Sequence, residues 1–440
     1  MKLSRGIALS LLLLDFGVIV SVALAYPVDA AAVTLRVGEQ GRDLAATLAI
    51  SQAGDRVEVP AGTWRGPVTI HKTITLIGTG GVIDGGGHGT TITVAAPGVV
   101  LENLRVQGSG QSLSGLTPDA CIRVLKTASQ SVVRRCELER CTFGIWVHET
   151  DGVRLESNRV IGTELGHRSN RGNGIHLFDA SHLVVSGNHV IGGRDGIYVS
   201  ATEDSLIADN LFERTRYGVH YMFSYRNTLR GNRSLANGSG YAIMSSHHLK
   251  VTGNLAEGNS HHGLLFRDVQ YSQISQNILR NNGEGLFFYS STENVIVDNH
   301  VLNNAVGVKI WAGSKRNEVR RNRFVGNRRQ VFYISTEDLV WAQQGEGNRW
   351  GDYLGWDADQ DGIGERPYRV DSFQATLIYR FPAAALLLRS PSLELLTHLE
   401  SRLALVRVPT VIDKRPLIRA AGRAQSLVES LGNAPERRRP

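Results

Sequence analysis

The chain has 440 residues, a length that allows one large domain or two to three domains of ordinary size. It contains 48 glycines, only 12 prolines and 7% aromatic residues, which suits a turn-rich β protein better than a helical bundle. The formal net charge is +7, but the sequence shows neither clustered aromatics nor an RNA- or DNA-binding motif. Nucleic-acid binding is therefore not indicated.

The N-terminal segment 1–25 has the features of a secretory signal peptide. Lys2 and Arg5 form a basic start, residues 7–24 are mostly apolar, and Ala23-Leu24-Ala25 fits a small-residue cleavage site. The alternative is an uncleaved anchor, because the apolar run is nearly long enough to span a membrane. We therefore expect an exported protein that is soluble once processed.

Residues 26–100 are expected to form an N-terminal cap and the first coils of a repeat structure. The stretch "RDLAATLAISQAGDRVEVPAGTW" predicts a short amphipathic cap followed by a strand, and "ITLIGTGGVIDGGGHGTTITV" predicts the first coils. A cap is expected because the open end of a solenoid would otherwise expose strand edges and core.

Residues 101–335 contain a repeat of about 22 residues, marked by two series of residues with the same period. The first series is Asn158, Asn188, Asn210, Asn232, Asn254, Asn277, Asn299 and Asn322. The second is Gly144, Gly174, Gly196, Gly218, Gly240, Gly263, Gly285 and Gly307. Each repeat holds two or three short alternating segments, which is too little chain for a helical hairpin. The pattern predicts an all-β fold, a right-handed parallel β-helix with one repeat per coil.

Several repeat positions carry structural expectations. Stacked Asn side chains are predicted to form a hydrogen-bonded ladder, and Asn also tolerates the left-handed backbone of a sharp corner. Asn103 marks a weak upstream copy, and Cys136 takes the Asn position one repeat before Asn158. The first spacing is longer than the others, so residues 162–171 are expected to leave the coil as a loop.

The three cysteines are too few for a disulfide scaffold, and their odd number leaves at least one unpaired. Cys121, Cys136 and Cys141 match no zinc-site spacing. We expect them to be buried small hydrophobic residues, with a metal or redox role as the alternative.

The outward side chains of one strand column are unusual. After each Gly, positions one and three are apolar and predicted to face the core, so positions two and four should face outward. Position two reads Trp146, His176, Tyr198, His220, Ala242, Leu265, Phe287 and Lys309. Position four reads His148, Phe178, Ser200, Met222, Met244, Arg267, Tyr289 and Trp311. The chain has three methionines, and the two after Met1 both lie in this column.

Three interpretations of this outward column remain open. Thioether and imidazole ligands suit a soft ion such as Cu(I), and the candidate copper ligands are His148, His176, His220, Met222 and Met244. An aromatic groove would instead suit sugar rings. Alternatively, the face is covered by the C-terminal tail or by a partner and binds no ligand.

Residues 336–380 are expected to form a C-terminal cap. Asp357, Asp359 and Asp361, followed by Gly362, match the first half of a calcium-binding loop and are candidate calcium ligands. Tyr368 stands where the closing Glu of such a loop would be. The alternative is an acidic turn without an ion.

Residues 381–440 form a basic tail, and from residue 389 on it carries ten Lys and Arg against five Asp and Glu. A Ser390-Pro391 pair predicts the start of a helix. Its apolar stripe consists of Leu396, Leu399, Leu403 and Val406. This amphipathic helix is expected to dock to a membrane complex or, alternatively, to pack on the solenoid.

An enzyme on this scaffold would be a polysaccharide lyase or a C5-epimerase, which needs an acid, a base and cations in one groove. The sequence shows no compact acid–base constellation, and it has no nucleophile elbow, phosphate loop or HExxH motif. The enzyme remains the alternative function.

The combined features resemble the NosD family over nearly the whole mature chain. The resemblance rests on the repeats, on "YGVHYMFSYRNTLRGN", on the cap "NRWGDYLGWDADQDGIGERPY" and on "VIDKRPLI" in the tail. It implies a non-catalytic periplasmic accessory protein that helps to assemble the copper–sulfur centre of nitrous oxide reductase. The implied partners are an inner-membrane ABC transporter (permease and ATPase), the apo-reductase and a copper-donor lipoprotein.

Overall fold

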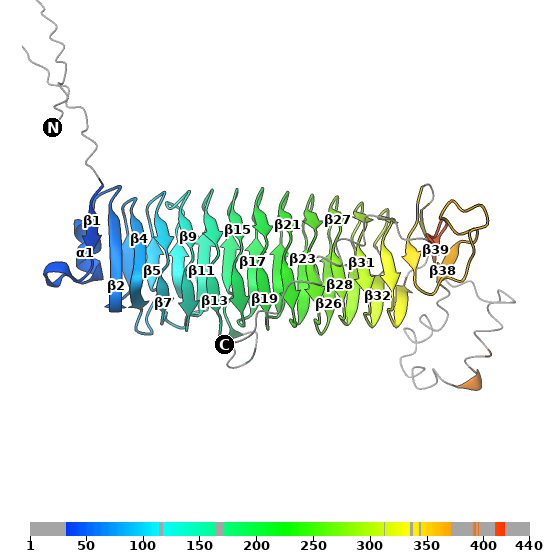
Figure 1. Ribbon diagram of the computed structural model, residues 1–440, viewed down its shortest axis with the longest axis horizontal. Coiled ribbons are helices and arrows are strands. Elements are labelled where there is room, and N and C mark those ends of the chain that lie inside the picture. The colour runs from blue at the N-terminus through cyan, green and yellow to red at the C-terminus, as the bar shows by residue number, and fades with distance from the viewer. Residues whose placement is uncertain are drawn as a thin grey trace, which may run out of the picture.

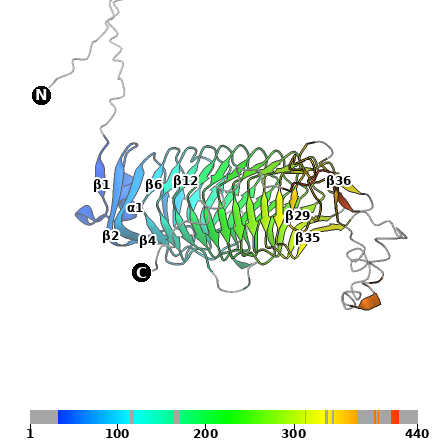
Figure 2. The ribbon, with the colours of Figure 1, turned by 45° about the vertical axis from the view of Figure 1, so that its right-hand side comes forward.

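The computed structural model describes residues 32–113, 118–163, 167, 170–311, 313–334, 338–342, 345–370, 390–392, 395 and 410–418. The expected signal peptide and the four apolar residues of the expected docking helix lie outside this part of the chain. Within it, Figures 1 and 2 show one elongated solenoid whose coils follow one another along the long axis. No helix in the described ranges is long and apolar enough to cross a membrane.

The N-terminal end of the solenoid is closed by a short cap. It comprises β1 (Thr34–Arg36), η1 (Glu39–Gly41) and α1 (Leu44–Ile50), seen at the blue end of Figure 1. The Asp43 carboxylate accepts a hydrogen bond of 2.8 Å from the Ala46 amide and so caps the helix. Leu44 and Leu48 are buried against the first coils, as the amphipathic pattern predicted.

Each coil contributes one strand to a 12-stranded parallel sheet and two strands to a 24-stranded one, as counted in the described residues. The smaller sheet contains β3 (Val68–Ile70), β5 (Ile92–Val94), β8 (Ala120–Val124), β11 (Phe143–His148), β14 (Ile175–Phe178), β17 (Asp195–Ser200), β20 (Tyr217–Met222), β23 (Ser239–Met244), β26 (His262–Arg267), β29 (Glu284–Tyr289), β32 (Val306–Trp311) and β35 (Arg329–Ile334).

The larger sheet contains β1, β2 (Arg56–Arg65), β4 (Thr75–Asp84), β6 (Val100–Glu102), β7 (Arg105–Gln107), β9 (Val132–Arg134), β10 (Glu137–Glu139), β12 (Arg154–Glu156), β13 (Arg159–Ile161), β15 (Val184–Ser186), β16 (His189–Ile191), β18 (Leu206–Ala208), β19 (Leu211–Glu213), β21 (Thr228–Arg230), β22 (Arg233–Leu235), β24 (Lys250–Thr252), β25 (Leu255–Glu257), β27 (Gln273–Ser275), β28 (Ile278–Arg280), β30 (Val295–Val297), β31 (His300–Leu302), β33 (Glu318–Arg320), β34 (Arg323–Val325) and β37 (Arg349–Trp350).

The strand register confirms the predicted inward positions. Ile197, Val219 and Tyr241 pair in parallel on neighbouring coils, and all three are fully buried. Stacking one coil on the next therefore builds a continuous core along the axis, which is how a solenoid becomes stable without any single coil folding alone. The parallel β-helix predicted from the repeat is present.

The repeat glycines are required by close backbone approach. A Cβ atom on Gly218 would lie 2.4 Å from the Ser234 Oγ and 2.6 Å from the Gly240 carbonyl oxygen. Asp195 pairs with Tyr217 and Ile197 pairs with Val219, but the two glycines between them do not pair. The backbone at each glycine therefore bulges toward the core. As a consequence, the residue before each glycine faces outward, beside position two.

The predicted Asn ladder is present, and its geometry is consistent along the solenoid. The amide oxygen of each Asn accepts hydrogen bonds from the backbone and the side chain of the Asn one coil earlier. For the Asn232 to Asn254 step these two distances are 3.0 Å each. The first acceptor of the series, Asn158, takes a bond from the Cys136 amide, which confirms that Cys136 occupies the Asn position.

One part of the Asn expectation is wrong. The left-handed backbone lies one residue earlier, at Asp209 (φ 57°) and Gly231 (φ 64°), while the ladder residues Asn210 and Asn232 are not left-handed. Asn103 itself has φ 54°, so it matches the corner residue, one place before the ladder position. The Asn is therefore needed for its side-chain amide, and the corner residue bears the conformational constraint.

A second stack of side-chain amides, which the sequence analysis did not identify, runs parallel to the first. It follows the next corner of the coil and comprises Asn237, Asn259, Asn282, Asn304 and Asn327. Each amide oxygen again accepts from the preceding coil, so two corners of every central coil are held by buried amide pairs.

Residues 410–418, which contain the whole "VIDKRPLI" motif, return to close the C-terminal end. Strand β39 (Val411–Asp413) pairs with β36 (Leu339–Trp341) and with β38 (Tyr368–Val370). The buried Asp413 carboxylate accepts from the Asn348 amide at 2.7 Å and from its side chain at 3.0 Å. It also accepts from the Trp350 indole at 3.0 Å. Asp413 therefore ends the first Asn ladder.

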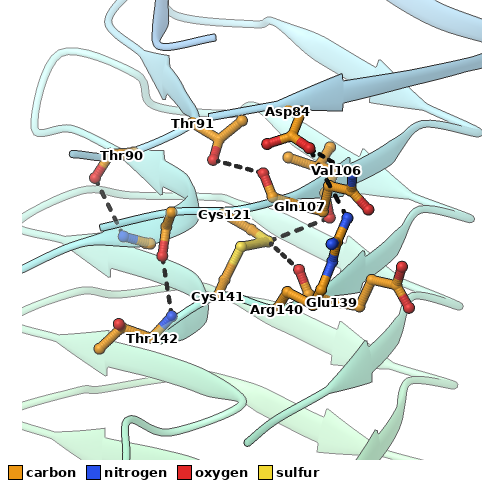
Figure 3. The surroundings of a disulfide bond; sticks show 12 residues. Asp84, Thr90, Thr91, Val106, Gln107, Cys121, Glu139, Arg140, Cys141 and Thr142 are labelled. Atoms are coloured by element: carbon orange, nitrogen blue, oxygen red, sulfur yellow. Dashed lines mark hydrogen bonds and ion pairs between the residues drawn. A yellow bond between two sulfur atoms is a disulfide. The ribbon is translucent and has the colours of Figure 1, made fainter. Parts of the chain in front are cut away.

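Two of the three cysteines form a disulfide, so the expectation of three buried small residues holds only for Cys136. Cys121 and Cys141 lie one coil apart with a Cα–Cα distance of 5.5 Å, and Figure 3 shows their bond beside Val106 and Glu139. Cys136 is a buried free thiol, and burial raises its pKa to about 12. A disulfide is compatible with an oxidising compartment.

Candidate functional site

The outer face of the 12-stranded sheet carries the candidate site. The position-two rings from Trp146 to His220 contact one another along the solenoid axis. The ring centroids of Trp146 and His176 are 3.7 Å apart, those of His176 and Tyr198 4.8 Å, and those of Tyr198 and His220 5.0 Å. The outward direction predicted for this column is confirmed, but the rings cover one another and leave His220 only 7% exposed.

His220 is held by a carboxylate that the sequence analysis missed. The His220 Nδ1 lies 3.1 Å from the Asp195 Oδ2, and Arg216 binds both oxygens of Asp195 at 2.9 and 2.7 Å. Burial alone would raise the pKa of Asp195, but the hydrogen bonds from His220 and Arg216 outweigh it and hold that pKa below its usual value. Asp195 stays ionised and fixes the orientation of the imidazole.

The other ring nitrogen of His220, Nε2, is buried and has no hydrogen-bond partner in the described structure. A buried polar atom without a partner is uncommon and calls for an explanation. In metal sites, a ligating His commonly donates one ring N–H to a carboxylate and binds the metal with the other nitrogen. His220 has this arrangement toward Asp195.

Two thioethers lie beside His220. Met222 is two residues further along β20 and so faces the same side, and its register partner on β23 is Met244. Neighbouring strands are about 4.8 Å apart, so both sulfur atoms can approach one ion together with His220. Both methionines are half-buried, and Met244 also packs against an apolar cluster of Ala242, Leu265 and Phe287.

The structure separates the two remaining candidate copper ligands from this group. His176 lies two strands from His220 with Tyr198 between them, or about 10 Å away at the usual strand spacing. Its Nδ1 is 3.0 Å from the Asn173 amide nitrogen. His148 lies further still, with its Nε2 3.2 Å from the Glu149 carboxylate. The geometry thus brings together His220, Met222 and Met244 and leaves out these two histidines.

The stacked His176 gives a pH prediction. Burial, with a smaller effect of Arg194, lowers its pKa to about 3, whereas the unfolded chain titrates near 6.5. The stability that depends on neutral His176 is complete above pH 6.5 and is lost as the pH falls toward 3. At pH 5 the loss is roughly 1–2 kcal/mol. Urea unfolding at the two pH values measures this loss. In His176→Phe, the free energy of unfolding should fall between pH 7 and pH 5 by that much less than in the wild type.

The control for this prediction is the exposed His182, whose pKa is raised by its hydrogen bond to Asp151. A raised pKa contributes stability at low pH, so His182→Gln should change the same difference slightly in the opposite sense. An unchanged pH dependence in His176→Phe would contradict the buried neutral imidazole.

A second polar network lies further along the outer face, and the sequence analysis did not find it. The Ser239 Oγ is 3.0 Å from the His262 Nδ1, and the His262 Nε2 is 3.3 Å from Glu284. The Lys309 Nζ is 2.7 Å from the other oxygen of Glu284. Ser239 is only 1% exposed, so it cannot act as a nucleophile, but Glu284, His262 and Lys309 do bring an acid–base pair and a cation together.

The three candidate calcium ligands lie together in the C-terminal cap. Ligand oxygens of Asp357, Asp359 and Asp361 all lie within 4.8 Å of one another, and Gly362 has the left-handed φ of 88°. Tyr368, at the position of the closing Glu, instead stacks on Trp350 at 4.2 Å. The calcium site stays a prediction, to be checked by a thermal shift with Ca²⁺ in the presence and absence of chelator.

The coils, the ladders and the outer face define a β-helix protein, and comparisons with known proteins agree. Residues 68–238 match the family described as right-handed β-helix region. Among solved structures, a family 28 exopolygalacturonase from Yersinia enterocolitica aligns with TM-score 0.54 at 11% identity over 70% of this chain and 77% of that one. The catalytic unit of a GH87 α-1,3-glucanase from Streptomyces thermodiastaticus gives 0.53 at 16% identity over 78% and 72%. At these identities the likeness concerns the fold alone.

Sequence relatives identify the family. Residues 163–355 match the family described as periplasmic copper-binding protein (NosD). A "Probable ABC transporter binding protein NosD" of Pseudomonas aeruginosa is 37% identical over 83% of this chain and 88% of its own length. One of Stutzerimonas stutzeri is 34% identical over 85% and 89%. The chain belongs to the NosD family.

Proposed function

We propose that this chain is a non-catalytic, copper-handling accessory protein of the periplasm. It would carry Cu(I) on its outer face for the copper–sulfur centre of nitrous oxide reductase while docked on an inner-membrane ABC transporter. The observation that carries the proposal is the unpartnered His220 Nε2 next to Met222 and its register partner Met244. Thioether and imidazole donors favour a soft ion such as Cu(I).

Relatives support the cellular setting. The matched family is described as periplasmic and copper-binding, and the relatives are named as ABC transporter binding proteins. The reductase and a copper-donor lipoprotein, both implied by the family resemblance, would then exchange copper with the exposed edge of this site. The disulfide between Cys121 and Cys141 fits an oxidising compartment.

The segment 371–409 is the proposed docking element. Its two ends are fixed side by side, because Val370 pairs with Val411 in the cap sheet and the Thr410 hydroxyl donates to the Val370 carbonyl oxygen. A stretch of chain that leaves and re-enters the cap at one point can present an apolar helix to a partner without disturbing the solenoid. Leu396, Leu399, Leu403 and Val406 belong to this stretch.

Docking is tested by replacing Leu399 and Leu403 with aspartate. We expect the variant to fold normally but to recover at least about tenfold less permease and ATPase from solubilised membranes, because two charges in an apolar interface cost several kcal/mol. Ile50→Asp, an exposed position at the opposite end of the solenoid, is the control and should recover the wild-type amount. Equal recovery by both variants would remove the docking assignment.

The alternative function is a polysaccharide lyase or C5-epimerase, and the Glu284–His262–Lys309 network is the observation that favours it. Incubation with uronate polymers separates the two functions. Chain cleavage or epimerisation that is abolished by Glu284→Gln, together with a lack of copper binding, would favour the enzyme over the accessory protein.

A further inference from the structure

A column of three basic residues lies on the outer side of the 24-stranded sheet near its C-terminal end. His300 on β31, Arg323 on β34 and Arg349 on β37 are register partners on three successive coils. Each is the residue that follows a ladder Asn, and each precedes an inward residue of its strand. At the usual strand spacing, the three backbones are about 4.8 Å apart from one to the next.

Two nitrogens of this column are buried and lack hydrogen bonds. His300 is only 8% exposed, and its Nδ1 has no partner among the described residues. The Nε of Arg323, the register partner of His300, is likewise buried and has no hydrogen-bond partner in the described residues. Two neighbouring buried nitrogens without partners are uncommon in a folded protein, where buried polar groups are normally hydrogen-bonded.

The charges around the column do not neutralise it. Arg323 and Arg349 form no ion pair within the described part of the chain, and the pKa of Arg323 is lowered by burial and by Arg349. Burial, with a smaller effect of Arg323, lowers the pKa of His300, so its imidazole is neutral near pH 7. Asp298 acts on that pKa in the opposite sense, but both of its oxygens already bind Arg321, at 2.8 and 2.7 Å. Arg323 and Arg349 therefore give the column a positive charge, and two of its buried nitrogens stay open.

The same column elsewhere on the sheet has no such cluster. Arg159 and His189 pair with Glu137 and Glu213 on neighbouring coils, at 3.4 and 2.7 Å. Arg233 stands between Leu211 and Leu255 and is a single cation. Adjacent cations without acids occur in this column only at Arg323 and Arg349, on β34 and β37, as far as the described residues extend.

We propose that His300, Arg323 and Arg349 form an oxyanion-binding site. Guanidinium groups present paired N–H donors that match the oxygens of a phosphate or a carboxylate, and an anion between two of them would satisfy the open nitrogens. The site is independent of the copper proposal, because it lies on a different sheet. The group bound is either a free inorganic oxyanion or a carboxylate of a partner protein.

Calorimetry with inorganic phosphate and with a triglutamate peptide tests the site in the full-length protein. We expect Arg323→Gln/Arg349→Gln to weaken binding at least about tenfold, which corresponds to about 1.4 kcal/mol. Arg323→Lys keeps the charge but loses the paired donors, so its affinity should lie between those of the wild type and the double variant. Arg233→Gln, at the same register position without cationic neighbours, should bind like the wild type.

The two ligands distinguish the two sources. Tighter binding of phosphate identifies a small oxyanion, and tighter binding of the peptide identifies a partner carboxylate. In either case the binding must be lost in the double variant. The proposal is overturned if neither ligand binds the wild type, or if Arg233→Gln reduces binding as much as the double variant does.

Discussion

Replacing His220 with glutamine and both Met222 and Met244 with leucine is expected to lower the Cu(I) affinity at least about 100-fold, or about 2.7 kcal/mol. The three changes remove the imidazole nitrogen and both thioether sulfurs. Leucine has nearly the volume of methionine, so the two Met→Leu changes should cost less than about 1.5 kcal/mol of stability each. Competition with a chromophoric Cu(I) chelator measures the affinity.

Two further variants make this test specific. Asp195→Asn keeps the shape of the residue that orients His220 but removes its charge, and we expect an intermediate loss of about 10- to 100-fold. His148→Gln alters a histidine outside the group and should leave the affinity unchanged. If the triple variant binds Cu(I) as tightly as the wild type, the ligand assignment is wrong.

Replacing Asn304 with alanine is expected to destabilise the solenoid by about 3 kcal/mol. The Asn304 side-chain oxygen accepts from the Asn282 backbone at 2.9 Å and from its side chain at 3.1 Å, and the Asn304 side-chain amide donates to the Leu279 carbonyl and to the Asn327 side chain. All of these groups are buried, so the substitution leaves donors and acceptors unpaired, at a cost of about 1 kcal/mol or more each. Chemical denaturation followed by circular dichroism measures the change.

The preceding residue provides a matched control. Asn303 has the same side chain but is exposed and left-handed, with φ 56°. Asn303→Ala should cost less than about 1 kcal/mol, because only the backbone preference changes. Similar losses in the two variants would show that the buried amide stack contributes little beyond the local turn.

The sequence predicted the β-helix because its Asn and Gly series share one period, which equals the length of one coil. It also predicted which of the position-two and position-four residues face outward, including His220 and Met222. It could not reveal the contribution of Asp195, because alternation counted from Gly196 places that residue in the core. The bulge at the glycine reverses this, and only the strand register shows it. Glu284 was missed for the same reason.

Contacts between distant segments were equally hidden. Asp413 ends a ladder at Asn348, 65 residues earlier, and no local pattern relates the two. The disulfide had a usable signal, since Cys121 and Cys141 are 20 residues apart, close to one repeat, which places them on adjacent coils. The period alone did not show that His176 lies too far from His220 to share an ion with it. The strand order shows this, because it places Tyr198 between them.

X-ray absorption at the copper edge of the Cu(I)-loaded protein tests the central claim most directly. We expect a mixed shell of one imidazole nitrogen and two sulfur atoms in the wild type. In Met222→Leu/Met244→Leu, the sulfur contribution should disappear while the imidazole remains. A shell of nitrogen and oxygen alone in the wild type, or a sulfur contribution that survives in the variant, would contradict a copper site on this face.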